Sequence, residues 1–406
     1  EELPAATLLR VTAEGTEALS RYWNPEYIQD SEMSLAEAVA GARERLLRAL
    51  EIRLRADVPL AFCLSGGIDS NCLISIAKRV FDYDVHGFTI INSDERYEEQ
   101  SMIDCAVREL GIRHTPIPAE PGPFIPMLRE MVRQYDGPMG TISHFAHWVL
   151  MEAVARHGYR IAIAGAAADE IFTGYYDHHL AYLYEVRNLP EVHAAARAAW
   201  VESIGSIVRN PLLKDPDAYI KNPGMRQHVF QRAGDFAEWL QQPWFEPFTE
   251  EHFTDDLLRN RMLNEMFRET VPVMLHDQDL NAMYFSIENR TPFLDRDLFE
   301  FCQRIPTRHL VRDARAKVVL RDAMRGIVPD PILDNRRKVG FNVPIFDYLD
   351  VRDPEVRAQL LEESPVFDFV RREKVEALLE KEELPNSESK FLFQFLNAKL
   401  FLEQFD

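Results

Sequence analysis

Cys63–Ser70 reads CLSGGIDS, the point at which a buried strand breaks into a glycine turn and then a helix. Residues 58–64 are almost continuously apolar, as in a parallel strand that is covered on both faces. After the turn, apolar residues recur at helical spacing up to Val80. Two adjacent glycines let the backbone approach an anion, and the N–H groups of the following helix point at the same place. The stretch therefore predicts a phosphate-binding turn.

Asp69 lies inside this turn, where its charge would repel a phosphate unless a cation lay between them. Carboxylate and phosphate oxygens are the ligands that Mg²⁺ prefers, so the position implies Mg²⁺. The turn contains no lysine and is not the Walker-type phosphate loop. SGGxDS instead resembles the pyrophosphate-binding loop of the N-type ATP pyrophosphatases, which split ATP between the α and β phosphates. That resemblance implies adenylation chemistry. The alternative is a tight strand-to-helix connection without a ligand.

Composition and charge narrow the class of protein. The chain has 406 residues, enough for two domains or for one large α/β domain with a helical partner. Its net charge of −20 argues against a nucleic-acid or anionic membrane partner. The four cysteines are scattered and form no C-x-x-C pair, which favours reduced thiols and a cytoplasmic protein. No stretch has the length of a membrane span, and the start at Glu1 suggests processing or an N-terminal truncation.

Strands and helices alternate along the first half of the chain. We expect strands at 58–64, 85–91, 113–117 and 160–164, and helices at 69–80, 97–110, 123–135 and 143–157. This alternation predicts an α/β fold with a doubly wound parallel sheet. Other expected elements are a strand at Thr7–Val11, a helix that begins at the capping box of residues 34–37, and helices within 190–260, 255–325 and 355–404. The predicted domains are a linker-like segment 1–30, an α/β core 31–190, and a helical insertion with the C-terminal part, 191–406.

A second motif follows the last predicted strand of the core. Gly165–Tyr175 reads GAAADEIFTGY and begins with small residues that let a ligand approach the backbone. In a doubly wound sheet, ligands bind beyond the carboxyl ends of the strands, so this motif and residues 65–70 should meet in one crevice. Asp69 and Asp169 could then share one Mg²⁺. As an alternative, Asp169 and Glu170 are the acidic residues of a helix N-terminus, where the helix dipole favours them.

Further segments make the resemblance to one family specific. The matching segments, in order, are Arg21–Pro25 (RYWNP), SGGIDS, Gly165–Tyr175, Ser286–Asp295 (SIENRTPFLD), Ala316–Arg321 (AKVVLR) and Arg336–Phe341 (RRKVGF). Over these segments the chain resembles the synthetase domain of the asparagine synthetase family, whose relatives include the β-lactam and carbapenam synthetases. The resemblance implies an α/β sheet of the ATP pyrophosphatase type with an additional helical C-terminal region.

The resemblance also implies roles for individual residues. Leu64 and Ile90 would line the adenosine pocket, and Asp69 and Asp169 would hold Mg²⁺. Residues implied to contact ATP through its phosphates or through the backbone are Ser65, Gly66, Gly67, Asp69, Ser70, Ala164 and Gly165. Lys338 lies where relatives carry a lysine that stabilises developing negative charge.

Several other polar residues have two interpretations each. Lys317 is a candidate for binding ATP phosphates, and its alternative is a solvated helix lysine. Glu288 is a candidate general base or substrate anchor, joined by Tyr284 if the segment is helical; its alternative is a buried partner of Arg290. Arg336 and Arg337 are surface charges or clamps. Histidines that lack a zinc-site pattern, and that we expect to be structural or at the surface, are His144, His147, His178 and His179.

The chain departs from the family at two places. Asparagine synthetases carry an acidic residue directly after the first glycine of the second motif, where this chain has Ala166. Alanine cannot accept a proton or orient an amine, which weakens the assignment of aspartate and ammonia as substrates and leaves adenylation intact. Ala167 replaces the next glycine and would restrict the turn if a positive φ is needed. Full-length asparagine synthetases also carry an N-terminal glutaminase with a terminal cysteine nucleophile, whereas the first cysteine of the given sequence is Cys63. We expect that the glutaminase was removed, that it is a separate subunit, or that the amine comes from free ammonia or the substrate itself.

We therefore expect an ATP-dependent carbon–nitrogen ligase that forms an acyl-adenylate, transfers the acyl group to nitrogen and releases AMP and pyrophosphate. Conversion of aspartate to asparagine is the family default. The alternatives are amidation of another carboxylate, such as a uronic acid or a biosynthetic intermediate, and intramolecular lactam formation. A catalytically silent nucleotide-binding regulator is an alternative of another class. Expected partners are a small carboxylate, an amine donor (ammonia or glutamine-derived), a glutaminase domain or subunit, and a second copy in a homodimer, with no nucleic acid and no membrane.

Overall fold

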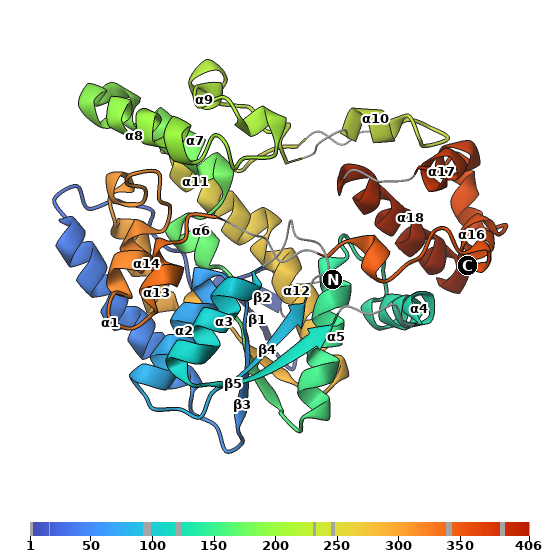
Figure 1. The fold of residues 1–406 in the computed structure, drawn as a ribbon, viewed down its shortest axis with the longest axis horizontal. Coiled ribbons are helices and arrows are strands. Elements are labelled where there is room, and N and C mark those ends of the chain that lie inside the picture. Colours follow the sequence, from blue (N-terminus) through green and yellow to red (C-terminus); the bar gives the residue numbers. More distant parts are fainter. Residues whose placement is uncertain are drawn as a thin grey trace.

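A parallel sheet with helices on both faces forms the centre of the computed structural model (Figure 1). The structure describes residues 3–15, 17–91, 99–118, 123–229, 233–244, 248–337, 343–381 and 386–405. Among these residues, every helix is too short or too polar to cross a membrane.

Within the described residues, the central sheet has the strand order β5-β4-β3-β6-β7 and pairs in parallel throughout. The strands are β3 (Leu60–Cys63), β4 (His86–Ile91), β5 (Arg113–Pro118), β6 (Ile161–Ile163) and β7 (Glu288–Arg290). The chain moves outward from β3 to β5 and then returns to the other side of β3 through β6 and β7. The order thus reverses between β3 and β6, and open α/β sheets bind ligands at such a switch point. The predicted doubly wound, parallel α/β fold is confirmed.

Alternate residues of β3 pack into different hydrophobic clusters on the two faces of the sheet. Leu60 and Phe62 pack with α1 (Leu35–Arg53), α2 (Ile68–Arg79) and α3 (Gln100–Leu110). Ala61 packs with α4 (Phe124–Tyr135), α5 (Ser143–Arg156) and the C-terminal helices. Successive side chains of a strand point to opposite faces, so a strand that is buried on both faces reads as a continuous apolar run.

The remaining helices begin within or after the second motif. The α-helices are α6 (Ala168–Phe172), α7 (Tyr176–Glu185), α8 (Pro190–Ser203), α9 (Ala218–Lys221), α10 (Ala233–Ala237), α11 (Leu257–Asn264), α12 (Val271–Tyr284), α13 (Arg296–Arg304), α14 (Val318–Ala323), α15 (Asp330–Asp334), α16 (Pro354–Leu361), α17 (Arg372–Leu379) and α18 (Asn386–Phe405). A π-helical turn, η4 (Glu265–Glu269), joins α11 to α12. The short 3₁₀ turns are η2 (Val186–Asn188), η3 (Pro211–Leu213), η5 (Pro292–Leu294), η6 (Thr307–His309), η7 (Ile345–Asp347) and η8 (Pro365–Asp368). In Figure 1, α8 and α9 lie beyond the carboxyl edge of the sheet, and α18 packs against α4.

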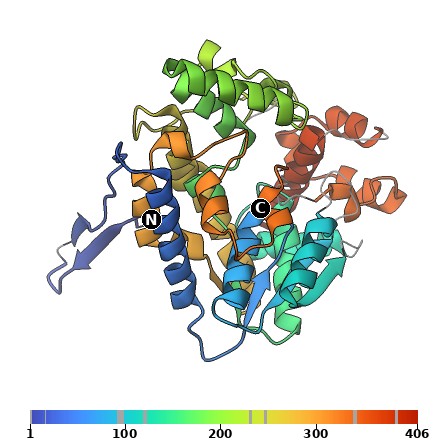
Figure 2. The ribbon, with the colours of Figure 1, turned by 60° about the vertical axis from the view of Figure 1, so that its left-hand side comes forward.

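Two N-terminal elements, β1 and α1, agree with the sequence prediction. The strand expected at Thr7–Val11 is present as β1 and pairs with β2 (Glu17–Arg21) in an antiparallel hairpin. Figure 2 shows this hairpin extending away from the rest of the ribbon. The capping box of Ser34 and Glu37 begins α1, with both reciprocal hydrogen bonds present.

One strand of the sheet was not predicted. Residues 255–325 were expected to be helical, yet β7 lies within them and extends the sheet beyond the predicted core range of 31–190. β7 is Glu-Asn-Arg, three polar residues at an edge of the sheet. The missing apolar alternation explains why the sequence pattern did not indicate a strand there.

Candidate active site

The turn after β3 is held together by its own polar groups. The Ser65 N–H donates to Ser70 Oγ at 3.1 Å, and the Asn71 amide donates to the carbonyls of Ser65 and Gly67 at 2.9 and 2.7 Å. Gly67 is the N-cap of the 12-residue α2 and supplies no side-chain acceptor for the N–H groups at the helix N-terminus. A helix N-terminus without its own acceptor suits an anionic ligand.

The turns that follow β3 and β6 lie in contact. A Cβ atom on Gly165 would lie 2.9 Å from Ser70 N and 3.2 Å from Asp69 Cβ, so glycine is needed for this approach. The Ala164 N–H donates to the Arg290 carbonyl at 2.9 Å and continues the sheet to the turn. Leu64 and Ile90, both buried, lie at the carboxyl ends of the paired strands β3 and β4. The residues predicted to bind ATP in the two motifs therefore gather at one edge of the sheet.

Asp69 and Asp169 converge on a single positive charge, the ammonium of Lys317. Its Nζ lies 2.5 Å from Asp69 Oδ1 and 2.7 Å from Asp169 Oδ1. The Lys317 side chain is 3% exposed, so the alternative of a solvated lysine does not hold. Carboxylate oxygens from two strand ends that meet at one cation are a donor set that fits Mg²⁺, and the ammonium marks the position of that cation.

Two backbone conformations that are rare for side-chain-bearing residues hold Lys317 in place. Lys317 has φ +59° and Thr173 has φ +71°. The Lys317 N–H donates to Thr173 Oγ1 at 3.0 Å. A Cβ atom on Gly174 would lie 1.6 Å from Asp169 Oδ1 and 2.8 Å from Lys317 Cε, so only glycine fits there. Such strain concentrates at functional sites, and the sequence carries no local signal for it.

A pocket beside Lys317 is lined by several cationic side chains. They are Arg315, Lys317, Arg321, Arg336 and Arg337, and Gly66 and Gly67 border the same space. Arg321 is buried, and its guanidinium donates to the carbonyls of Ala316 and Leu333 at 2.8 and 2.6 Å. This local positive charge suits phosphate groups. Arg315 and Arg321 were not predicted as site residues, because arginines in a helical segment resemble ordinary surface charges.

Glu288, which was predicted to be catalytic, does not join this group. Glu288 begins β7; its side chain is 59% exposed, and Oε1 lies 2.7 Å from Arg290 Nε. Parallel strands begin at the edge opposite the site, so Glu288 lies at the far end of the sheet and we assign it no catalytic role. Its alternative as the partner of Arg290 fits, although the carboxylate is exposed rather than buried. Tyr284 donates to Glu130 at 3.4 Å. Lys338 lies outside the described residues.

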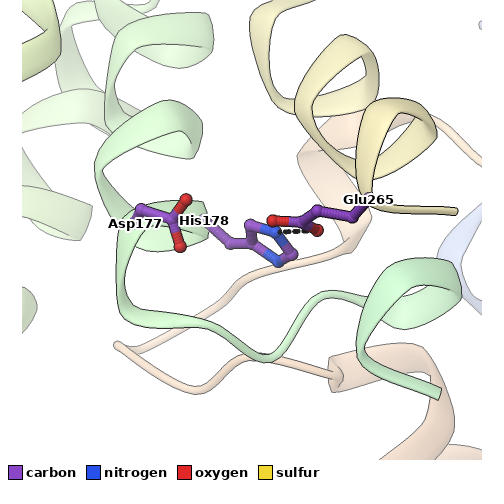
Figure 3. A group of neighbouring side chains, drawn as sticks. All are labelled: Asp177, His178 and Glu265. Atoms are coloured by element: carbon purple, nitrogen blue, oxygen red, sulfur yellow. Dashed lines mark hydrogen bonds and ion pairs between the residues drawn. The ribbon is translucent and has the colours of Figure 1, made fainter. Parts of the chain in front are cut away.

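A buried ionic network lies behind the turn of residues 173–174 (Figure 3). His178 Nε2–H donates to Glu265 Oε2 at 2.8 Å, and His178 Nδ1 accepts the Gly174 N–H at 3.2 Å. Arg261 Nε lies 3.1 Å from Glu265 Oε1 and 3.9 Å from Asp177 Oδ2. Asp177, His178 and Glu265 are, within the described ranges, the one group of three close enough to share a metal ion. Both nitrogens of His178 have partners and Arg261 supplies positive charge, so we interpret the group as structural.

Burial shifts the ionisation of two groups beside the site. Glu170 is buried, and this burial, with the charges of Asp169 and Glu265, raises the pKa of Glu170 to about 7. Burial and the neighbouring His178 lower the pKa of His179 to about 4, so its imidazole is neutral at neutral pH. Asp169 and Glu170 do lie in the first turn of α6, as their alternative interpretation predicted, but both are buried.

Comparison with known proteins agrees with the resemblance. The family model described as asparagine synthase matches residues 41–403. The chain is 26% identical over 365 residues to the glutamine-hydrolyzing asparagine synthetase 1 of Bacillus subtilis, an alignment that covers 87% of this chain and 56% of that protein. It is 26% identical over 369 residues to the amidase chyE of Penicillium rubens, covering 78% of this chain and 54% of that protein. The chain thus spans about half the length of these curated relatives.

Proposed function

Since the chain belongs to the asparagine synthase family, we propose that it uses ATP to activate a carboxylate and then passes the acyl group to a nitrogen nucleophile. One observation carries the proposal: Asp69, Asp169 and Lys317 meet beside the turns that follow β3 and β6. Backbone N–H groups and cationic side chains at this place would bind a triphosphate, and the two carboxylates would bind its metal ion.

Each part of ATP has proposed contacts at the carboxyl edge of the sheet. Leu64 and Ile90 line the adenosine pocket, and Ala164 and Gly165 offer backbone groups to the nucleotide. Ser65, Gly66, Gly67 and Ser70 bind the pyrophosphate moiety through N–H and O–H donors, with Lys317 and the arginines of the pocket facing the same phosphates. Asp69 and Asp169 would hold Mg²⁺, which when bound offsets negative charge on the phosphates.

The proposed reaction has two steps. A carboxyl oxygen of the substrate attacks the α-phosphorus, and pyrophosphate leaves with the electron pair of the broken P–O bond; Lys317 and Arg321 stabilise that leaving group. An amine then attacks the acyl carbon, loses a proton and displaces AMP. Lys338, which lies outside the described residues, is the proposed donor to the oxyanion of this second step. Losing one such donor typically lowers a rate ~10²–10³-fold.

The identity of the carboxylate is a separate part of the proposal. Aspartate is the family default, with ammonia or glutamine-derived ammonia from a glutaminase domain or subunit as the nitrogen source. Ala166 stands where asparagine synthetases carry an acid, which favours a second candidate: amidation of another carboxylate, or lactam closure within one substrate. The candidate that is not an enzyme is a catalytically silent regulator that binds the nucleotide.

The test is acid-dependent exchange of labelled pyrophosphate into ATP, screened over aspartate, other amino acids and sugar acids. We expect exchange with at least one acid; exchange with aspartate supports the default, and exchange with another acid alone supports the second candidate. Asp69→Asn should abolish exchange, whereas Asp57→Asn, an exposed aspartate, should not change it. Lys338→Ala should reduce product formation more than exchange. ATP binding without exchange for any acid would favour the silent regulator.

A further inference from the structure

Two charged side chains of the chain lie where the metal ion and a phosphate of ATP are expected. We propose that Lys317 and Glu99 are internal counter-ions of the ATP site, which the metal–nucleotide complex displaces together. A free divalent ion or a free nucleotide would then bind weakly, and each would require the other. This inference rests on the proposed function, because it takes Asp69 and Asp169 as the metal ligands.

Lys317 competes for the metal position. Its ammonium lies 2.5 and 2.7 Å from the Oδ1 atoms of Asp69 and Asp169, and the side chain is 3% exposed. A Mg²⁺ ion bound to both oxygens at about 2.0–2.1 Å would lie against this ammonium, and two cations in contact repel each other. The two carboxylates therefore bind either the lysine or the metal ion.

A displaced Lys317 needs a new anion. The lysine has a flexible stem, so its ammonium can move while the backbone stays hydrogen-bonded to Thr173. The adjoining pocket, however, already holds Arg315 and Arg321. Moving another positive charge there is unfavourable unless phosphate groups arrive with the metal ion. A metal ion bound to a triphosphate meets this requirement, and a metal ion alone does not.

Glu99 competes for the phosphate position. Its Oε2 accepts the Gly66 N–H at 3.2 Å, one of the donors proposed for the pyrophosphate moiety. A Cβ atom on Gly66 would lie 2.6 Å from Glu99 Cβ and 3.1 Å from Met102 Cβ, so Glu99 packs directly on the turn. A phosphate that binds this N–H must replace the carboxylate, and the two anions repel each other. Nucleotide without a metal ion therefore meets both this repulsion and the net charge of −20.

The first test measures Mn²⁺ binding to nucleotide-free protein by electron paramagnetic resonance. We expect the parent protein to bind Mn²⁺ weakly and Lys317→Met to bind one ion at least ~10-fold more tightly, a coupling typical of two competing ligands. Asp169→Asn added to Lys317→Met should remove that site. Lys214→Met, an exposed lysine, is the matched control and should behave as the parent. Thermal unfolding checks each variant, and Lys317→Gln replaces Lys317→Met if the latter does not fold.

The second test measures the binding of inorganic pyrophosphate by calorimetry without a divalent ion. Glu99→Gln removes the competing charge, so we expect it to bind pyrophosphate ~5-fold or more tightly than the parent. Glu191→Gln, an exposed glutamate in the first turn of α8, should not change the affinity. Equal affinities in Glu99→Gln and the parent would refute the role of Glu99.

Failure of the inference and failure of the proposed function give different results. If the parent binds Mn²⁺ as tightly as Lys317→Met does, the inference is overturned whatever the enzyme catalyses. Mn²⁺ together with α,β-methylene-ATP tests the proposed function: lack of nucleotide binding by the parent would refute it. The Mn²⁺ titrations of nucleotide-free protein would still decide whether Lys317 competes for the metal position.

Discussion

The candidate site combines charged side chains with backbone conformations that residues other than glycine rarely adopt. Ala167, Thr173 and Lys317 all have positive φ angles and lie around Asp169. A residue held in such a sparsely populated region costs about 1–3 kcal/mol. These residues hold the carboxylate of Asp169 and the ammonium of Lys317 at a fixed separation, and this precise placement is what electrostatic catalysis requires.

Gly174→Ala should inactivate the enzyme. The added Cβ would lie 1.6 Å from Asp169 Oδ1, so the carboxylate must move away from its position beside Lys317. We expect pyrophosphate exchange to fall ~100-fold or more, a size typical of lost electrostatic preorganisation. Gly224→Ala is the control, since its Cβ would make only an ordinary contact at 3.6 Å. If Gly174→Ala shows unchanged exchange, Asp169 does not have the proposed role as a metal ligand.

Ala167→Gly should stabilise the protein. The sequence raised the question whether this turn needs a positive φ, and Ala167 has φ +71°. Glycine removes a strain of about 1–2 kcal/mol and adds an entropic cost of about 0.5–1 kcal/mol, so the middle of the two ranges gives an expected net gain of about 0.75 kcal/mol. Urea unfolding measures the change. A loss of stability would mean that the alanine methyl group contributes more through packing than the backbone strain costs.

Among the elements, α7 and the π-helical turn η4 pack against the turn of residues 173–174 that carries part of the site. His178 of α7 donates to Glu265 of η4 (Figure 3) and accepts the Gly174 N–H. Arg261 of α11 joins the same network through Glu265 and Asp177. A π-helical turn inside an α-helix is uncommon and is frequently found near functional sites. These helices therefore hold the turn that carries Thr173 and Gly174.

His178→Phe should weaken both stability and activity. The substitution leaves the buried Gly174 N–H without its acceptor, which costs about 1–3 kcal/mol for an unpaired polar group. It also removes the imidazole donor to Glu265 Oε2, while Arg261 still pairs with Oε1. His178→Gln keeps one acceptor and one donor and should restore much of the exchange activity. His252→Phe, an exposed histidine, is the control. If His178→Gln is no more active than His178→Phe, the hydrogen bonds do not position the turn.

Across the whole molecule, the last strand of the sheet is joined to the end of the first long helix. Arg290 of β7 donates from Nη1 to the carbonyls of Arg53 and Arg55 at 2.6 and 2.9 Å. Arg53 is the last residue of α1 and also binds Asp295 at 2.9 Å. These contacts connect segments that are separated by more than 230 residues, so they stabilise the assembly of the sheet with α1 rather than one element.

Arg290→Lys should therefore lower stability while activity in the folded protein is kept. A lysine has one ammonium and cannot bind both carbonyls and the Glu288 carboxylate in the same geometry. We expect a loss of about 0.5–1.5 kcal/mol in urea unfolding, the usual net contribution of a hydrogen bond, because the Arg53 carbonyl is only partly buried and the Arg55 carbonyl is exposed. Arg10→Lys on the exposed hairpin is the control, with a negligible change. If the folded Arg290→Lys protein loses pyrophosphate exchange, Arg290 instead takes part in the reaction.

Much of the central fold could be predicted from local patterns. The predicted strands and helices between residues 58 and 164 lie within a few residues of β3–β6 and α2–α5. Apolar periodicity, glycine turns and capping residues act between neighbours in sequence, so they can be recognised without a structure. The meeting of Asp69 and Asp169 was also predictable, because the carboxyl ends of adjacent parallel strands share one edge of a sheet.

By itself, then, the sequence determined the parallel sheet and the two turns that carry the carboxylates. Only the tertiary structure decided that β7 completes the sheet, that Glu288 lies at its far end, and that Lys317 lies between Asp69 and Asp169. Lys317 and Asp69 are 248 residues apart, and a contact over that distance depends on how helices and loops pack. Such packing leaves no periodic pattern in the chain, because it is specified by shape and charge complementarity between distant segments.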